Sequence, residues 1–193
     1  MSDFFYLASQ SPRRKEILDA LSAPYRLLNL VEGPGENADF DETPIPNEMP
    51  TLYVNRVSLL KASAAWRYLV DHRLEKAPVL TVDTTVTLDD KILGKPEDAE
   101  DARLMLQRLS GREHQVLTAV TMKQGGEIHQ TLSMTNVCMQ SLSESNIERY
   151  IQTAEPFGKA GSYGIQGIAS IFISHISGSH SGVVGLPIYE TSE

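Results

Sequence analysis

The sequence predicts one α/β domain built on a mixed, elongated sheet flanked by helices, and three observations indicate this fold class. Short apolar and β-branched runs alternate along the chain with segments whose apolar residues recur at helical spacing. The runs 115–122 and 128–139 are joined at Gly125-Gly126, which is typical of an antiparallel hairpin. The 193 residues contain no repeat and no linker, so a single domain over 1–193 is expected.

The first part of the chain predicts a strand, a helix, a long loop and a second helix. Residues 4–8 are short and aromatic, as in a buried strand. Ser11 is a favourable N-cap and Pro12 suits the first helical position, so a helix should run from there to about residue 21. Residues 31–50 are rich in Gly, Pro, Asp, Glu and Asn and predict a loop, and a helix follows over about 51–70.

The remaining elements follow in the same alternation. Residues 79–88 predict a strong strand, with a turn at Asp89-Asp90 leading into residues 92–93. Acids in the first turn and Gly111 beyond the end mark a helix over 97–109, before the hairpin. Ser143 should cap a helix that ends by Pro156. A glycine-rich loop over 158–167, a strand over 168–176 and a turn at Gly178 complete the prediction.

Composition limits the partners and the compartment. The formal net charge is −8, from 17 Lys+Arg against 25 Asp+Glu, which argues against a general nucleic-acid-binding protein. Cys138 is the sole cysteine, so neither an internal disulfide nor a Cys-rich zinc site is expected. No stretch approaches the ~20 apolar residues of a membrane span. We therefore expect a cytoplasmic protein.

The start of the first helix contradicts local propensity. Arg13, Arg14 and Lys15 occupy the opening turn, where the helix dipole already disfavours positive charge. A bound polyanion would reverse that effect, and the serine hydroxyls of Ser9 and Ser11 could join the free backbone N–H groups in a phosphate cradle. The alternative is a solvated basic turn with an ordinary Ser-Pro cap.

A second contradiction is Asp83, in the middle of the strongest predicted strand, where Asp is among the least favoured residues. One interpretation is a solvent-facing residue on an edge strand. The other is a carboxylate held rigidly on a sheet, as a general base or a metal ligand. The sequence pattern does not separate the base from the ligand.

A third unusual segment, 160–167, holds three glycines just before a predicted strand. Glycines allow close approach of the backbone to a ligand, and the Gln166 amide could bind the edge of a nucleobase. Lys95 and Lys61 are further cations that could reach a phosphate, although each alone is typical of a solvated surface lysine.

Taken together and in chain order, several motifs closely resemble those of the Maf family of nucleoside triphosphate pyrophosphatases. They are Leu7-Ala8-Ser9-Gln10-Ser11-Pro12-Arg13-Arg14, Val82-Asp83-Thr84, Gly94-Lys95-Pro96, Leu109-Ser110-Gly111, Ala160-Gly161-Ser162-Tyr163-Gly164-Ile165-Gln166-Gly167 and Val184-Gly185-Leu186-Pro187. The resemblance implies a fold related to the inosine triphosphate pyrophosphatases, with two lobes around a cleft. It also implies hydrolysis of a nucleoside triphosphate to the monophosphate and pyrophosphate with a divalent metal, Mg²⁺ or Mn²⁺.

The resemblance also implies roles for individual residues. Asp83 would activate water for attack on the α-phosphorus, and Glu42 would join it at the metal. The triphosphate would be held by Ser9, Arg13, Arg14, Lys61 and Lys95. Arg13, Thr84 and Gln166 match the subgroup that acts on dTTP and UTP, which implies a role in removing noncanonical pyrimidine nucleotides.

Two alternatives stay open. One is a 7-methyl-GTP pyrophosphatase of the same family, and the other is a non-catalytic, nucleotide-binding regulator of septum formation. A homodimer is also left open.

Overall fold

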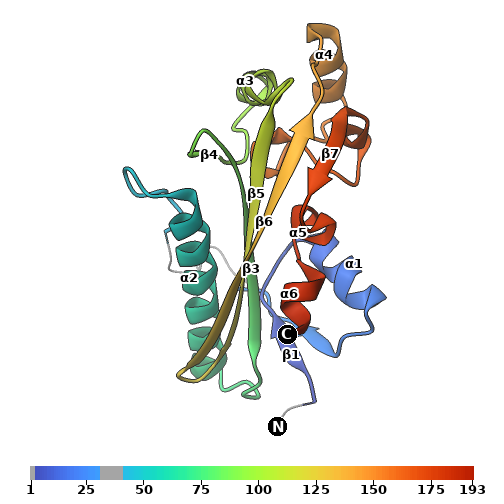
Figure 1. Ribbon diagram of the computed structural model, residues 1–193. Coiled ribbons are helices and arrows are strands. Elements are labelled where there is room, and N and C mark those ends of the chain that lie inside the picture. Colours follow the sequence, from blue (N-terminus) through green and yellow to red (C-terminus); the bar gives the residue numbers. More distant parts are fainter. Residues whose placement is uncertain (1–2, 31–40) are drawn as a thin grey trace. The chain divides into compact units, whose positions relative to one another are not determined.

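The computed structural model describes residues 3–30 and 41–193, and its seven strands form one mixed sheet (Figure 1). The strand order is β2-β1-β3-β5-β6-β7, and β4 pairs with β3 off this path. The strands are β1 (Phe5–Leu7), β2 (Tyr25–Leu27), β3 (Val79–Leu88), β4 (Lys91–Leu93), β5 (Glu113–Gln124), β6 (Glu127–Met139) and β7 (Ile173–Ser177). β1 pairs in parallel with β2 and β3, whereas β4 and β7 pair antiparallel to their neighbours. The predicted α/β class with a mixed sheet is therefore confirmed.

The helices are interspersed with these strands. They are α1 (Pro12–Ala20), α2 (Pro50–Asp71), α3 (Ala99–Leu109), α4 (Glu144–Gln152), α5 (His180–Val184) and α6 (Ile188–Ser192), with 3₁₀ turns η1 (Ala160–Ser162) and η2 (Ile168–Phe172). The chain divides into two compact units, each assembled from separate segments. Unit 1 comprises residues 1–83, 119–132 and 188–193, and unit 2 comprises residues 84–118 and 133–187. The single domain over 1–193 and the cleft stay predictions.

In unit 1, α1 and α2 lie on opposite sides of the strands (Figure 1). One core cluster includes Tyr6 on β1, Val79 on β3 and Leu69 on α2. Polar contacts add to this packing, because Thr81 Oγ1 donates to the carbonyl of Ser58 on α2 at 2.8 Å. Helix α2 is therefore fixed directly against the face of β3 that also carries Asp83.

In unit 2, α3 packs beside α4, and both cover a continuous apolar core. Leu106 and Leu109 of α3 meet Ile147 and Tyr150 of α4 in that core. Asp98 caps α3 by accepting from the Asp101 amide at 2.8 Å, as N-cap acids do. The amphipathic pattern of the sequence predicts both helices correctly because one face of each is buried here.

Three details of the structure differ from the predicted elements. The segment predicted as a strand over 168–176 is the 3₁₀ turn η2 followed by β7, which begins only at Ile173. Strand β2 has no counterpart in the prediction, and neither do the short helices α5 and α6. Ser11 occupies the N-cap position of α1, but its side chain makes no capping hydrogen bond to the described residues. Residues 31–40 of the predicted loop lie outside the described residues.

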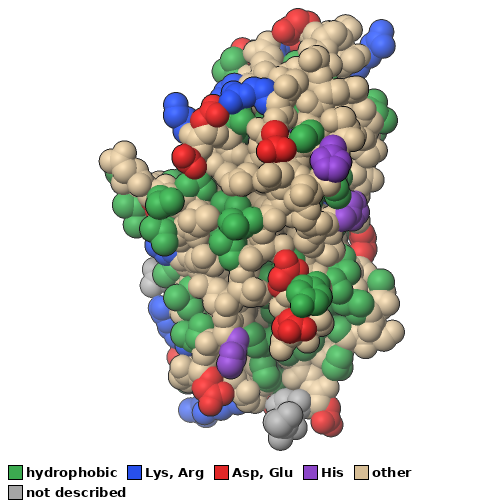
Figure 2. All heavy atoms as spheres, viewed as in Figure 1, with side chains coloured by type: hydrophobic (Ala, Val, Ile, Leu, Met, Phe, Trp, Pro, Cys, Tyr) green, Lys and Arg blue, Asp and Glu red, His purple; other side chains and the backbone are tan. Residues whose placement is uncertain are grey.

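The surface carries one group of hydrophobic side chains around the start of α2. Ile45, Met49 and Leu52 are each more than half exposed there. Figure 2 shows hydrophobic side chains gathered over this end of α2. Within residues 3–30 and 41–193, no helix is long and apolar enough to span a bilayer.

Candidate active site

Asp83 lies on the central strand β3, between β1 and β5, and its residue is only 8% exposed. The interpretation of Asp83 as a solvent-facing residue of an edge strand is therefore wrong. Its Oδ1 accepts a hydrogen bond from Lys61 Nζ at 2.7 Å. A buried carboxylate needs such a partner, since an unpaired charge in this position would be strongly disfavoured.

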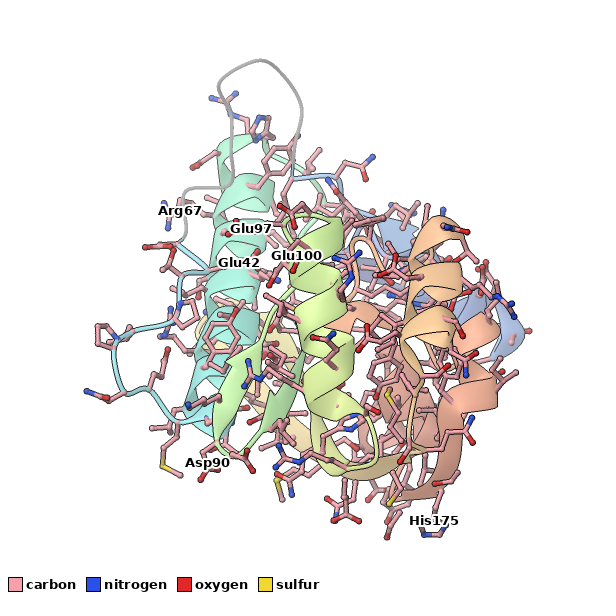
Figure 3. All side chains as sticks on the ribbon, turned by 90° about the horizontal axis from the view of Figure 1, so that it is seen from above. Glu42, Arg67, Asp90, Glu97, Glu100 and His175 are labelled. Carbon is pink, nitrogen blue, oxygen red and sulfur yellow. The ribbon has the colours of Figure 1, made fainter. Side chains whose placement is uncertain are left out.

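Lys61 joins Asp83 to a second carboxylate. Its Nζ lies 3.1 Å from Glu42 Oε2, and Figure 3 shows Glu42 beside α2. One ammonium group thus contacts both acids, so the two carboxylates converge on one point. Glu42 precedes Lys61 by nineteen residues and lies in a segment without regular secondary structure, yet the structure brings it to the same ammonium as Asp83. Its role at a metal stays a prediction.

Ser9, Arg13 and Arg14 lie at the junction of β1 and α1. Ser9 Oγ accepts from Arg14 Nη1 at 3.0 Å and from the Ser11 amide at 3.3 Å. Ser9 lies between β1, which ends at Leu7, and α1, which begins at Pro12, and both arginines belong to the first turn of α1. A phosphate cradle would use such a place, and phosphate binding here stays a prediction.

The electrostatics of Arg14 connect this cluster to the acids. Burial lowers the pKa of Arg14 to about 10, opposed by the charges of Asp83 and Glu42 and reinforced by Arg13. The guanidinium therefore remains a cation at neutral pH. Two arginines, a lysine and two carboxylates share one region of unit 1, which suits a ligand that carries both phosphates and a cation.

Arg13 contributes a buried donor that lacks a protein acceptor. Its Nε is shielded from solvent and has no hydrogen-bond partner among the described residues. Buried polar groups are almost always paired, so an orphaned guanidinium nitrogen indicates a missing acceptor. A phosphate oxygen would supply it with the geometry that arginine prefers.

Tyr53 belongs to the same site and was not identified from the sequence. Burial, together with the negative charges of Asp83 and Glu42, raises its pKa to about 12, so the phenol stays protonated. Tyr53 precedes Lys61 by eight residues on α2, and this spacing places both on one helical face. That spacing is the only signal by which the sequence could have identified it.

The other candidate residues belong to unit 2. Thr84 follows Asp83 on β3, where successive side chains point to opposite faces, and its Oγ1 lies 3.0 Å from Thr118 Oγ1. Lys95 is exposed between Gly94 and Pro96, after β4. Gln166 is exposed in the turn that the Gly167 amide closes on the Gly164 carbonyl. Their membership of one site with the cluster of unit 1 stays a prediction.

The Gln166 turn is supported by a carboxylate that the sequence did not single out. Glu155 accepts from the amides of Ile168 and Ala169, at 2.8 and 3.2 Å, and from the Tyr150 hydroxyl at 2.9 Å. A Cβ on Gly167 would stand 2.3 Å from Glu155 Oε2, so any larger residue at this position would have to displace the Glu155 carboxylate. These contacts explain why η2 replaces the predicted strand, since its first amides are already bonded.

Glu42 and Asp83 fit a divalent cation such as Mg²⁺ or Mn²⁺. Both offer carboxylate oxygens to one point, which is the donor type these hard cations prefer. Within the described part of the chain, no group of three or more His, Cys, Asp and Glu side chains could hold a metal alone. This small donor set is typical of Mg²⁺, which keeps several waters and takes other ligands from substrate phosphates.

Known proteins resemble this chain over nearly its whole length. A family model described as "Maf-like protein" matches residues 4–193. A protein of Cupriavidus pinatubonensis named dTTP/UTP pyrophosphatase is 49% identical over 192 residues, covering 100% of this chain and 95% of its own length. Two further proteins of that name are similar over 97% of this chain and 90% of their own, at 51% identity in Ralstonia nicotianae and 48% in Chromobacterium violaceum.

Among solved structures, the Ham1 protein of Staphylococcus aureus matches with a TM-score of 0.47 and 14% identity. The match covers 70% of this chain and 71% of that one.

Proposed function

Because this chain belongs to the Maf family, we propose that it is a nucleoside triphosphate pyrophosphatase that hydrolyses dTTP and UTP to the monophosphate and pyrophosphate. The observation that carries this proposal is the buried Asp83 carboxylate, which Lys61 holds beside Glu42. The same unit contains Arg13, whose buried Nε has no acceptor in the part of the chain that the structure describes. Relatives that are 48–51% identical over 97–100% of this chain are named dTTP/UTP pyrophosphatase. A cytoplasmic location and a free nucleotide, rather than a nucleic-acid polymer, belong to the same proposal.

In the proposed reaction, Asp83 acts as the general base. Its carboxylate removes a proton from a water molecule as the water oxygen attacks the α-phosphorus. The bond between the α-phosphorus and the oxygen that bridges to the β-phosphorus breaks, and pyrophosphate leaves with the bonding electrons. The central strand fixes the carboxylate, and the hydrogen bond from the Lys61 ammonium at 2.7 Å orients it.

The cations of unit 1 bind and orient the triphosphate. Arg13 Nε supplies a donor that finds no acceptor within residues 3–30 and 41–193, and Arg14 stays charged despite its burial. Ser9 Oγ and the N–H groups at the start of α1 complete a set of donors for phosphate oxygens. In phosphoryl transfer the protein mainly positions groups and neutralises charge, and this cluster does both.

A divalent cation completes the proposed site, with Glu42 and Asp83 as its protein ligands. When bound, it would neutralise charge that develops on the phosphate oxygens. Tyr53 remains a neutral phenol beside both acids, so it can donate a hydrogen bond to either carboxylate without adding charge.

Preference for thymine or uracil rests on Gln166, Thr84 and the names of the relatives. A glutamine amide offers a donor and an acceptor, which suits the O4 and N3–H edge of these bases. The Glu155 contacts fix the turn that carries Gln166. Lys95, exposed on the loop after β4, would add a cation for the same substrate, and clearance of noncanonical pyrimidine nucleotides would follow from the same base preference.

The test measures pyrophosphate release from dTTP, UTP, 7-methyl-GTP and ATP with Mg²⁺ or Mn²⁺, for wild type, Asp83→Asn and Asp90→Asn. We expect dTTP and UTP to be preferred, and Asp83→Asn to lose about 10²–10⁴-fold in kcat, as for removal of a general base. Asp90 is an exposed turn residue, so Asp90→Asn is the matched control and should keep wild-type activity.

Absence of pyrophosphate release from every nucleotide would refute the enzyme proposal and favour a regulator without turnover. Preference for 7-methyl-GTP would instead assign the chain to the 7-methyl-GTP pyrophosphatase subgroup. Full activity of Asp83→Asn would overturn the assignment of Asp83 as the general base.

A further inference from the structure

Glu42 is an acid of the proposed site that lies outside any helix or strand. Residues 41–49 form no helix or strand, and Glu42 itself is exposed along much of its length. Such a segment would ordinarily sample many conformations, which would weaken the binding of a metal that takes Glu42 as a ligand. Some other contact must therefore keep Glu42 beside Lys61.

Arg56 of α2 supplies that contact from both sides of Glu42. Its Nη1 donates to the carbonyl of Asp41 at 3.3 Å, and its Nη2 donates to the carbonyl of Thr43 at 3.0 Å. One guanidinium thus binds the backbone immediately before and immediately after the acid. Arg56 and Lys61 are both on α2, so one rigid helix holds the backbone through the first residue and the carboxylate through the second.

Glu48 fixes the guanidinium in turn. Its two oxygens accept from Arg56 Nε at 2.6 Å and from Nη2 at 2.7 Å, a paired geometry that fixes the plane of the fork. Glu48 Oε2 also accepts from the Ile45 amide at 3.1 Å, which ties the segment to itself. The Glu48 side chain is only 8% exposed, so this pair is stronger than an ordinary surface ion pair.

We propose that Arg56, oriented by Glu48, is a positioning residue that holds Glu42 at the divalent-metal site. The inference rests on the proposed function for the identity of that metal. The Arg56 guanidinium lies 5.7 Å from the centre of the Tyr53 ring and, among the described residues, makes no hydrogen bond to Lys61 or Asp83. Its hydrogen bonds therefore act on Glu42 through the backbone of residues 41–43. All three of its nitrogens are engaged, and a lysine ammonium could not reproduce that planar arrangement.

The first measurement is Mn²⁺ affinity of the substrate-free protein, by electron paramagnetic resonance of free Mn²⁺. Loss of a group that orients a metal ligand typically weakens affinity about 10–100-fold, and we expect that range for both Arg56→Gln and Arg56→Lys. Arg67→Gln is the matched control, because Arg67 is an exposed arginine of the same helix (Figure 3). It should bind Mn²⁺ like wild type.

A double-mutant cycle separates positioning from a general charge effect. If Arg56 acts through Glu42, adding Arg56→Gln to Glu42→Gln weakens Mn²⁺ binding no further than Glu42→Gln alone. If the two losses multiply, or if Arg56→Lys retains wild-type affinity, the positive charge alone matters and the proposal is overturned. Wild-type affinity in Arg56→Gln, or no Mn²⁺ binding by wild type, overturns it as well.

Hydrogen exchange gives a readout that does not depend on hydrolysis. The amides of Thr43 and Ile45 are bonded to Asp41 and Glu48, so they should exchange faster in Arg56→Gln and Glu48→Gln but not in Arg67→Gln. Glu48→Gln retains Arg56 but removes the carboxylate that orients it, so this variant tests the same role if Arg56→Gln fails to fold. Unchanged exchange in Glu48→Gln and Arg56→Lys refutes the positioning role.

The two proposals can fail separately. A wild-type protein that hydrolyses no nucleotide, but shows these losses of Mn²⁺ affinity and protection, refutes the proposed function and supports the role of Arg56.

Discussion

Acidification from pH 7 to pH 5 should destabilise this protein through one buried histidine, His114 on β5. The residue is 3% exposed, and its Nε2 lies 2.7 Å from the Tyr163 hydroxyl. Burial lowers its pKa from 6.5 to about 4, because the charged imidazolium loses its hydration inside unit 2. Below pH 6.5 the unfolded chain therefore binds a proton that the folded chain does not bind. The stabilisation by neutral His114 is complete above that pH and declines as the pH falls toward 4.

The size of the effect follows from the difference between the two pKa values. Each pH unit in this window changes the free energy of unfolding by about 1.4 kcal/mol. From pH 6.5 to pH 5 the loss is therefore about 2 kcal/mol. For a chain of this length, that loss corresponds to a fall in melting temperature of roughly 4–8 °C. Carboxylates with lowered pKa values contribute mainly at lower pH, so the window above pH 5 isolates the histidine.

The assay is urea unfolding at pH 7, 6 and 5, monitored by circular dichroism, for wild type, His114→Gln and His175→Gln. His114→Gln lacks the titrating ring, so its stability should vary by less than about 0.5 kcal/mol over this range. His175 is exposed on β7, and His175→Gln should lose stability like wild type. Equal wild-type stability at pH 7 and pH 5, or the full loss in His114→Gln, would refute the reasoning.

Three further predictions concern a glycine, the arginine cluster and the metal. Gly161 has φ +67°, and a Cβ added there would stand 2.9 Å from Val86 Cγ2. Gly161→Ala should therefore lower the free energy of unfolding by about 2 kcal/mol in a denaturant titration. Gly126 has open space around it, so Gly126→Ala should leave the free energy of unfolding unchanged. Arg13→Lys keeps the charge but lacks Nε, so steady-state kinetics should show KM for dTTP raised about tenfold, and an unchanged KM would contradict the phosphate role. Chelation with EDTA should stop pyrophosphate release yet shift the melting temperature by less than about 2 °C, because the Lys61 ammonium already contacts both Glu42 and Asp83. Unfolding of the protein on chelation would contradict this prediction.

The sequence predicts the elements whose own residues carry a periodic pattern. The sequence predicts helix α2 and strand β3 because the apolar residues of each recur at the spacing of that element, and most of those residues are buried. Strand β2 spans only Tyr25–Leu27 and has no such pattern, so only its pairing with β1 reveals it. The segment beginning at Ile168 has strand-like composition, but Glu155, thirteen residues earlier, takes its amides.

The residues of the candidate site differ in the same way: some stand out in their own element, and others depend on contacts with distant segments. Asp83 and the arginines of α1 stand out because each contradicts the preference of its own element. Glu42 entered only through the resemblance to a family, and its contact with Lys61 depends on the path of a segment without periodicity. Tyr53 and Arg56 look like ordinary helix residues, and their roles arise from partners that lie elsewhere in the chain.

The ammonium of Lys61 between Glu42 and Asp83 has a consequence for how the protein is made in the cell. Two acids that converge without a counter-ion repel each other, and proteins built in that way often need their metal before they can fold. Here the chain carries its own cation to the same place. If the proposed metal dependence holds, a newly synthesised molecule would not need the metal in order to fold, and it would become active when the metal binds.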